Sequence, residues 1–81
     1  MDEFRVSHKT IGEDGEITHL WIDGVQFKRN VVIDLINVGN KFYVDIDGEI
    51  SEIVIHNVIH LRTKKNGIIK DNLKKLPIYK L

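Results

Sequence analysis

Two histidines are the residues of this chain whose spacing first suggests metal chemistry. His56 and His60 are four residues apart, a spacing that would let both bind one metal ion on a helix. Here the spacing spans an expected turn and strand, and the Glu of the zinc-protease motif is absent. A turn histidine and a packed histidine are therefore the preferred interpretation. We expect no metal site and no cofactor.

Carboxylates gather between residues 45 and 52. Asp45-Ile46-Asp47-Gly48-Glu49 resembles part of a calcium-binding loop, but the later ligands and the closing Glu are not at the required positions. Asp45 and Glu52 share one face of the expected sheet and could form a catalytic pair, but no third group accompanies them. Acids on the solvent-facing side of a hairpin explain both patterns. Neither Ser7 nor Ser51 has a local base, so we expect a protein that is not an enzyme.

Basic residues are concentrated near the end of the chain. Residues 61–81 carry seven basic residues and one acidic residue, although the formal net charge of the whole chain is zero. A candidate nucleic-acid surface consists of Arg62, Lys64, Lys65, Lys70, Lys74 and Lys75. Tyr79 could stack on a base, with Trp21 or Tyr43 beside it. Because affinity for nucleic acid comes largely from phosphate neutralisation, the zero net charge makes this the alternative interpretation.

Length and composition predict one globular domain over residues 1–81. The apolar fraction is 42% and the charged fraction 30%, which is typical of a folded chain. Cysteine is absent, which is compatible with a reducing compartment. The charged N-terminus lacks the apolar run of a signal peptide, and the longest uninterrupted apolar run is three residues. We expect a cytoplasmic protein without membrane contact.

Hydrophobic periodicity predicts an α+β fold. Alternation indicates strands at residues 4–8, 17–22, 42–46, 50–55 and 58–63. Residues 29–38 are rich in β-branched side chains, but Asn30, Asp34 and Asn37 fall within roughly 60° of one another at helical period, and Gly39 suits the C′ position. We therefore expect an antiparallel sheet of about five strands in the order ββαβββ, with one helix on one face and a C-terminal tail.

Two tight turns set the expected register. Asp47-Gly48 is a strong two-residue hairpin signal and His56-Asn57 a weaker one. Residues 64–70 are expected to form a polar loop, and residues 72–76 one short helical turn. The two registers place one apolar set toward the helix: Phe42, Val44, Ile46, Ile53, Ile55 and Val58.

The opposite face is also partly apolar. It is expected to carry Tyr43, Ile50, Val54, Ile59 and Leu61, mixed with Asp45 and Glu52. Such a face is too apolar to stay open in a stable monomer. The candidates to cover it are a second copy of the chain or the tail residues Leu73, Leu76, Ile78, Tyr79 and Leu81.

The last third of the chain resembles a known family. His60-Leu61-Arg62-Thr63, then Asp71-Asn72-Leu73, then Leu76-Pro77 are similar to the closing signature of a family of short bacterial proteins catalogued only as a domain of unknown function. That family typically has Tyr-Leu-Arg-Thr, a polar loop, Asn-Leu and then Leu-Pro. This chain departs from the pattern at His60 and lacks the usual small polar cap before the helix. The resemblance implies a bacterial or phage source and a cytosolic setting, and it implies no activity.

The same motif offers the one candidate ligand site. Arg62, Thr63, Asp71 and Asn72 could form a polar pocket for a planar polar group, because an Arg with an acid and an amide can recognise one. Packing of Leu73 and Leu76, with Asn72 capping the chain, is the simpler explanation. The leading hypothesis is a non-catalytic interaction module with a protein partner or a second copy of itself.

Overall fold

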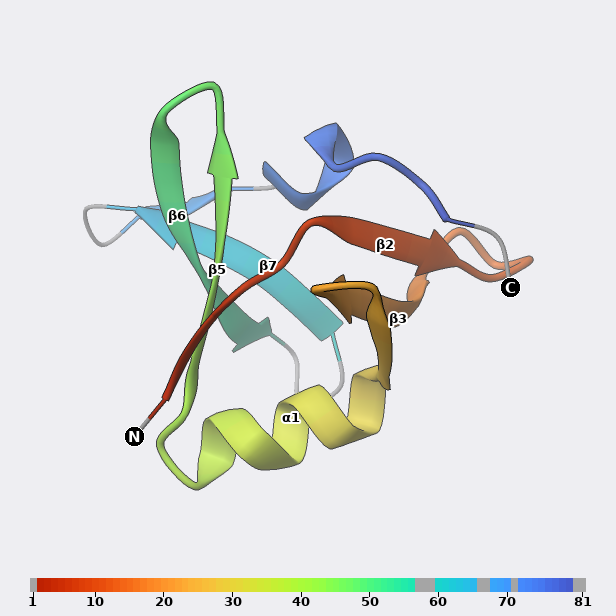
Figure 1. Ribbon diagram of the computed structural model, residues 1–81, viewed down its shortest axis with the longest axis horizontal. Helices are drawn as coiled ribbons and strands as arrows, with labels where there is room; N and C mark the ends of the chain where they lie inside the picture. Colours follow the sequence, from red (N-terminus) through yellow and green to blue (C-terminus); the bar gives the residue numbers. More distant parts are fainter. Residues whose placement is uncertain (1, 57–59, 66–67, 71, 80–81) are drawn as a thin grey trace.

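The computed structural model describes residues 2–56, 60–65, 68–70 and 72–79, which form an α+β fold (Figure 1). Eight strands, one α-helix and one 3-10 helix are present in this part of the chain. The strands are β1 (Glu3–Arg5), β2 (His8–Ile11), β3 (Ile17–Ile22), β4 (Val25–Lys28), β5 (Lys41–Ile46), β6 (Glu49–His56), β7 (His60–Lys65) and β8 (Ile68–Lys70). The helices are α1 (Arg29–Asn37) and η1 (Asn72–Lys75).

The strands form two sheets rather than the single sheet that the sequence predicted. A five-stranded sheet has the order β1-β5-β6-β7-β8, and a three-stranded sheet has the order β2-β3-β4. The chain changes sheets between two adjacent residues. The Val6 N–H donates to the Tyr43 carbonyl, and the Ser7 N–H donates to the Trp21 carbonyl. The expected strand 4–8 is therefore two strands, of which β1 runs parallel to β5.

Two of the hairpins were not predicted. Asp23-Gly24 was expected only to end a strand, but its positive φ values of 51° and 79° form the tight turn that returns β4 along β3. The expected polar loop 64–70 is wrong, because Lys65 pairs with Ile68 and β8 continues to Lys70. An Asp-Gly or Asn-Gly pair thus marks both missed hairpins.

The first predicted register is confirmed and the second is wrong. Val44 pairs with Ser51 across the Asp47-Gly48 turn, as expected. Beyond the next turn Ile53 pairs with Thr63, whereas a two-residue turn would have placed it opposite His60. The connection spans residues 57–59, which lie outside the described residues. The predicted faces of Val58 and Ile59 therefore also lie outside the described part of the chain. The register is therefore shifted by three residues. Because an odd shift exchanges the two faces of a strand, Leu61 lies on the core side and not on the predicted outer side.

Helix α1 is confirmed within one residue of its predicted end. Val32 is fully buried, and the polar arc of Asn30, Asp34 and Asn37 is exposed. Gly39 follows the helix with a φ of 104°, which only glycine adopts readily. Lys28 occupies the N-cap without a side-chain capping bond, in keeping with the missing polar cap. No helix in the described part of the chain is long and apolar enough to cross a membrane.

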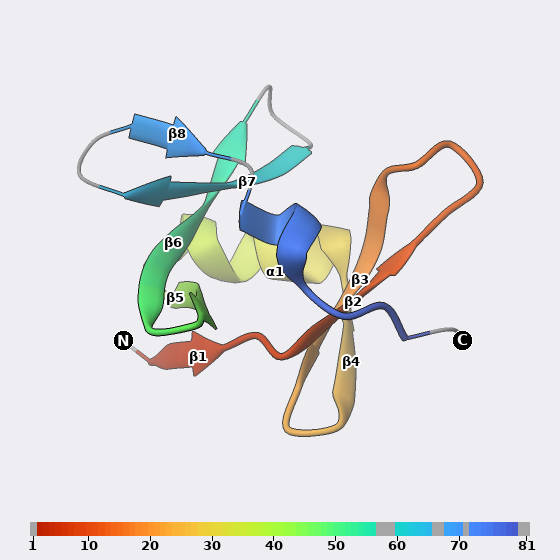
Figure 2. The ribbon, with the colours of Figure 1, turned by 90° about the horizontal axis from the view of Figure 1, so that it is seen from above.

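The core lies between the two sheets and is closed by both helices. Figure 2 shows α1 and η1 on the same, inner side of the five-stranded sheet. The buried apolar side chains are Val6, Leu20, Ile22, Val32, Phe42, Val44, Ile53, Leu61, Leu73 and Leu76. The tail leucines therefore complete the core beside the helix. The expectation that Leu73 and Leu76 cover the opposite sheet face is wrong.

Candidate interaction face

The outward side of the five-stranded sheet presents a mixed apolar and charged surface. Side chains alternate along each strand, so residues that pair with Tyr43 or lie two positions away from it share its face. We define the outer face by this register as Glu3, Arg5, Lys41, Tyr43, Asp45, Ile50, Glu52, Val54, Arg62 and Lys64. It carries three acidic and four basic side chains. The core side chains Phe42 and Val44 point the other way.

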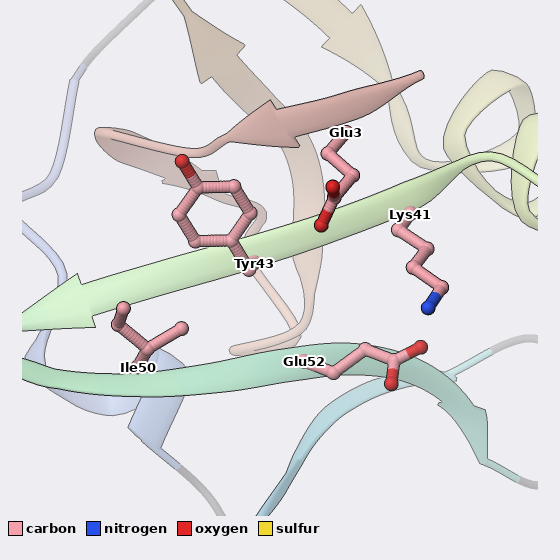
Figure 3. A pocket seen from close by; sticks show the side chains of 5 residues that line it. All are labelled: Glu3, Lys41, Tyr43, Ile50 and Glu52. Carbon is pink, nitrogen blue, oxygen red and sulfur yellow. The ribbon is translucent and has the colours of Figure 1, made fainter. Parts of the chain in front are cut away.

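A hollow of about 410 Å³ lies in this face. Its lining comes from three strands and consists of Glu3, Lys41, Tyr43, Ile50 and Glu52 (Figure 3). The Tyr43 ring and the Ile50 side chain lie side by side on β5 and β6, and Ile50 is 57% exposed. An apolar floor of this kind, with charged groups around it, is typical of a protein-binding surface.

The charges around the hollow are not neutralised by one another. Glu3 and Glu52 contribute carboxylates and Lys41 an ammonium, and the structure shows no ion pair among these three described residues. Asp45 shares their face, as predicted, but its carboxylate accepts a 3.0 Å hydrogen bond from the Gly48 N–H. Asp45 therefore stabilises the turn.

The four residues of the predicted polar pocket occupy different environments. Thr63 is fully buried on the core side of β7. Arg62 is half-buried, and its Nη1 donates a 2.8 Å hydrogen bond to the Leu61 carbonyl. Asn72 begins η1, and Asp71 lies outside the described residues. Adjacent strand residues point to opposite faces, so Arg62 and Thr63 do not converge on one ligand.

The predicted basic surface is divided between two elements. Lys64 lies on the outer face, while Lys74 and Lys75 are exposed on η1 at the inner side of the sheet. Lys65 and Lys70 lie in β7 and β8. A second hollow, of about 240 Å³, brings Arg62 and Lys74 together with the buried Lys9. Of the six residues of the predicted basic surface, Arg62 and Lys74 line this hollow.

The aromatic side chains proposed as a stacking platform already contact protein groups. The Tyr79 ring stacks on His8 with centroids 3.7 Å apart, and the Trp21 ring meets it edge-on at 5.2 Å. Tyr43 lies on the opposite side of the fold, in the outer face. The three rings therefore do not form one surface.

One histidine of the predicted pair makes a structural contact. His56 and His60 are opposite each other in the β6–β7 ladder, and His60 Nδ1 lies 3.2 Å from a carboxylate oxygen of Glu16 in the β2–β3 connection. Among the described residues, no three His, Cys, Asp or Glu side chains gather as metal ligands would. The His60–Glu16 contact joins the two sheets at one end.

The chain matches no known family model, no curated protein and no solved structure. The resemblance of the closing motif to the bacterial family therefore stays a prediction. The proposals below therefore start from the positions and charges of the residues in the structure.

Proposed function

We propose that this protein is a non-catalytic interaction module that binds a second copy of itself through the outer face. The observation that carries the proposal is the hollow between Tyr43 and Ile50, with apolar side chains at its centre and charges of both signs at its rim. Because η1 and α1 both pack on the inner side, these helices leave the outer face open.

Charge pattern favours a second copy as the occupant. A two-fold interface brings each surface against itself, so the surface must be self-complementary. The outer face carries side chains of both charge signs, three acidic and four basic. Lys41 lies at one end of the hollow, and Glu52 lies on the neighbouring strand. Antiparallel stacking of two such faces would pair Lys41 of each copy with Glu52 of the other.

The available area is compatible with such a dimer. The protein exposes 5278 Å² in total. A standard interface removes about 800 Å² from each partner, which would be about 15% of this surface. Two sheets that stack face to face lie about 10 Å apart.

Sedimentation equilibrium of the wild-type chain tests the proposal, with Ile50→Arg as the disrupting variant. Val25→Arg is the matched control, because Val25 is also an exposed strand residue, at 56% against 57% for Ile50, and lies on the other sheet. We expect the wild type and the control to form dimers, and Ile50→Arg to be a monomer. A monomeric wild type at high concentration would overturn the proposal.

Nucleic-acid binding is the second candidate. One observation favours it: Arg62 and Lys74, from two neighbouring elements near the end of the chain, line the same hollow with Lys9. Convergent cations can contact a phosphate. The division of the remaining lysines between two sides of the sheet is the reason that it ranks second.

A further inference from the structure

The C-terminal segment Pro77–Tyr79 lies along the exposed edge of the three-stranded sheet. Strand β2 is the outer strand of that sheet. Ile78 forms a parallel bridge with Lys9, with the Lys9 N–H donating to the Pro77 carbonyl at 3.0 Å and the Tyr79 N–H donating to the Lys9 carbonyl at 2.8 Å. In Figure 1 this segment runs beside β2 toward the C-terminus. It therefore extends the sheet as a short added strand.

Side chains of the sheet hold this segment at its aromatic residue. Tyr79 stacks on His8 with a ring angle of 12°, and the Trp21 ring meets it at 82°. Thr10 Oγ1 donates a 2.7 Å hydrogen bond to the Tyr79 carbonyl. The β2 edge thus offers main-chain pairing together with a subsite for one aromatic ring. These are the two elements of peptide recognition by strand addition.

The segment is more exposed than the residues before it. Leu73 and Leu76 are buried, whereas Ile78 is 56% exposed and Tyr79 is 42% exposed. A hollow of about 620 Å³ adjoins the segment and is lined by Thr10, Ile11, Gly12, Thr18, His19, Ile78 and Tyr79. The edge can therefore lose Pro77–Tyr79 without opening the core, and it has room for a ligand larger than this segment.

We propose that the β2 edge, with His8, Thr10 and Trp21, is a peptide-binding groove that the protein's own C-terminal segment occupies as an intramolecular competitor. The occupant that it fits is an extended segment of a partner protein with proline, an aliphatic residue and an aromatic residue in succession. This partner adds in parallel to β2 and places its aromatic ring on His8. The groove is separate from the outer face, which lies on the other sheet.

The protein's own C-terminal segment and a free peptide are expected to compete for the groove. A tethered segment acts at an effective concentration of about 1 mM, so it suppresses the binding of a free peptide of the same sequence. Tyr79→Pro in the full chain removes both the N–H donated to Lys9 and the ring stacked on His8, while Leu73 and Leu76 remain. This substitution should empty the groove and leave the core intact.

The test is fluorescence polarisation with a labelled peptide of residues 75–81, Lys-Leu-Pro-Ile-Tyr-Lys-Leu. We expect Tyr79→Pro to bind it at least about tenfold more tightly than the wild type. Adding Thr10→Val, which removes the donor to the Tyr79 carbonyl, should reverse the gain. A peptide with Ala in place of Tyr should bind weakly to every variant. Tyr79→Ala serves as a second release variant, and circular dichroism checks that each variant is folded.

Equal affinity of folded Tyr79→Pro, folded Tyr79→Ala and the wild type for this peptide would overturn the proposal. Equal binding of the tyrosine and alanine peptides would also overturn it, because the groove is defined by its aromatic subsite.

Discussion

The indole N–H of Trp21 donates a 2.8 Å hydrogen bond to Thr10 Oγ1, which in turn donates to the carbonyl of Tyr79. Thr10 is 6% exposed, so this hydroxyl connects two strands and the C-terminal segment from inside the structure. A hydroxyl has one donor and two acceptor sites, and both kinds are used here.

Thr10→Val should destabilise the protein by about 1–3 kcal/mol, because the isosteric substitution leaves the Trp21 N–H and the Tyr79 carbonyl without this partner. Chemical denaturation measures the difference. Thr18→Val is the control, since the Thr18 hydroxyl makes one longer bond of 3.3 Å to the Thr10 carbonyl. Its cost should be below about 1 kcal/mol. Equal costs for the two variants would contradict the connecting role of Thr10.

Leu73→Ala should cost about 2–5 kcal/mol of unfolding free energy, the usual range for a fully buried leucine. The reason is that Leu73 fills the core beside Phe42 and Leu61 rather than lying on the surface. Ile78→Ala, five residues later and 56% exposed, should change stability by less than about 0.5 kcal/mol. Urea unfolding curves of both variants check the contrast, and a small effect of Leu73→Ala would place η1 outside the core.

Gly48→Ala should cost about 1 kcal/mol through the backbone alone. Gly48 has a φ of 86°, and a Cβ placed there meets no atom within 4 Å. The penalty therefore comes from the left-handed conformation and not from a clash. Gly48→Asn should cost less, because Asn tolerates this region better than Ala. Thermal unfolding measures both, and an Ala variant as stable as the wild type would exclude the positive φ at this turn.

The elements that sequence predicted best are those with one dominant local signal. Asp47-Gly48 imposes a tight turn, so its flanking strands and their register were predictable. The polar arc of α1 and Gly39 likewise identified the helix against its β-branched composition. Both signals act over a few residues, and tertiary contacts reinforce them.

The division into two sheets was not predictable in the same way. Residues 4–8 alternate as one strand, but long-range bonds to Tyr43 and Trp21 send its halves to different sheets. The register of β7 depended on the position and length of a turn with a weak signal, and a shift of three residues reversed the face of Leu61. Asp23-Gly24 was a usable signal for β4, whose four residues alternate too weakly to mark a strand by themselves.

The residues of the outer face also differ in whether a local signal or a long-range pairing places them there. Tyr43, Ile50, Val54, Asp45 and Glu52 were placed on one face from the first turn, and the structure keeps them there. Glu3 joined them only through the parallel pairing of β1 with β5, which no local pattern indicates. Lys41 lies one residue before the predicted strand 42–46 and shares the face of Tyr43 by alternation.

Replacing Lys64, Lys74 and Lys75 together by Ala tests the nucleic-acid alternative. If it holds, affinity for single-stranded RNA should fall, and the slope of log K against log salt should flatten by about two to three units. The control replaces three exposed cations outside the basic segment, Arg5, Lys28 and Lys41. Electrophoretic mobility shifts at low salt provide the readout. An absence of RNA and DNA binding by the wild type would end this alternative.

Reversing charges across the proposed two-fold interface gives the sharpest test of the dimer. Lys41→Glu should place the introduced carboxylate of each copy against Glu52 of the other, and Glu52→Lys should oppose two ammonium groups, so each variant alone should be monomeric. Mixing the two variants should restore dimers, because both contacts then join opposite charges. Sedimentation equilibrium of each variant and of the equimolar mixture measures this recovery. Dimers that survive in both single variants, or a mixture that stays monomeric, would show that Lys41 does not face Glu52 of a second copy.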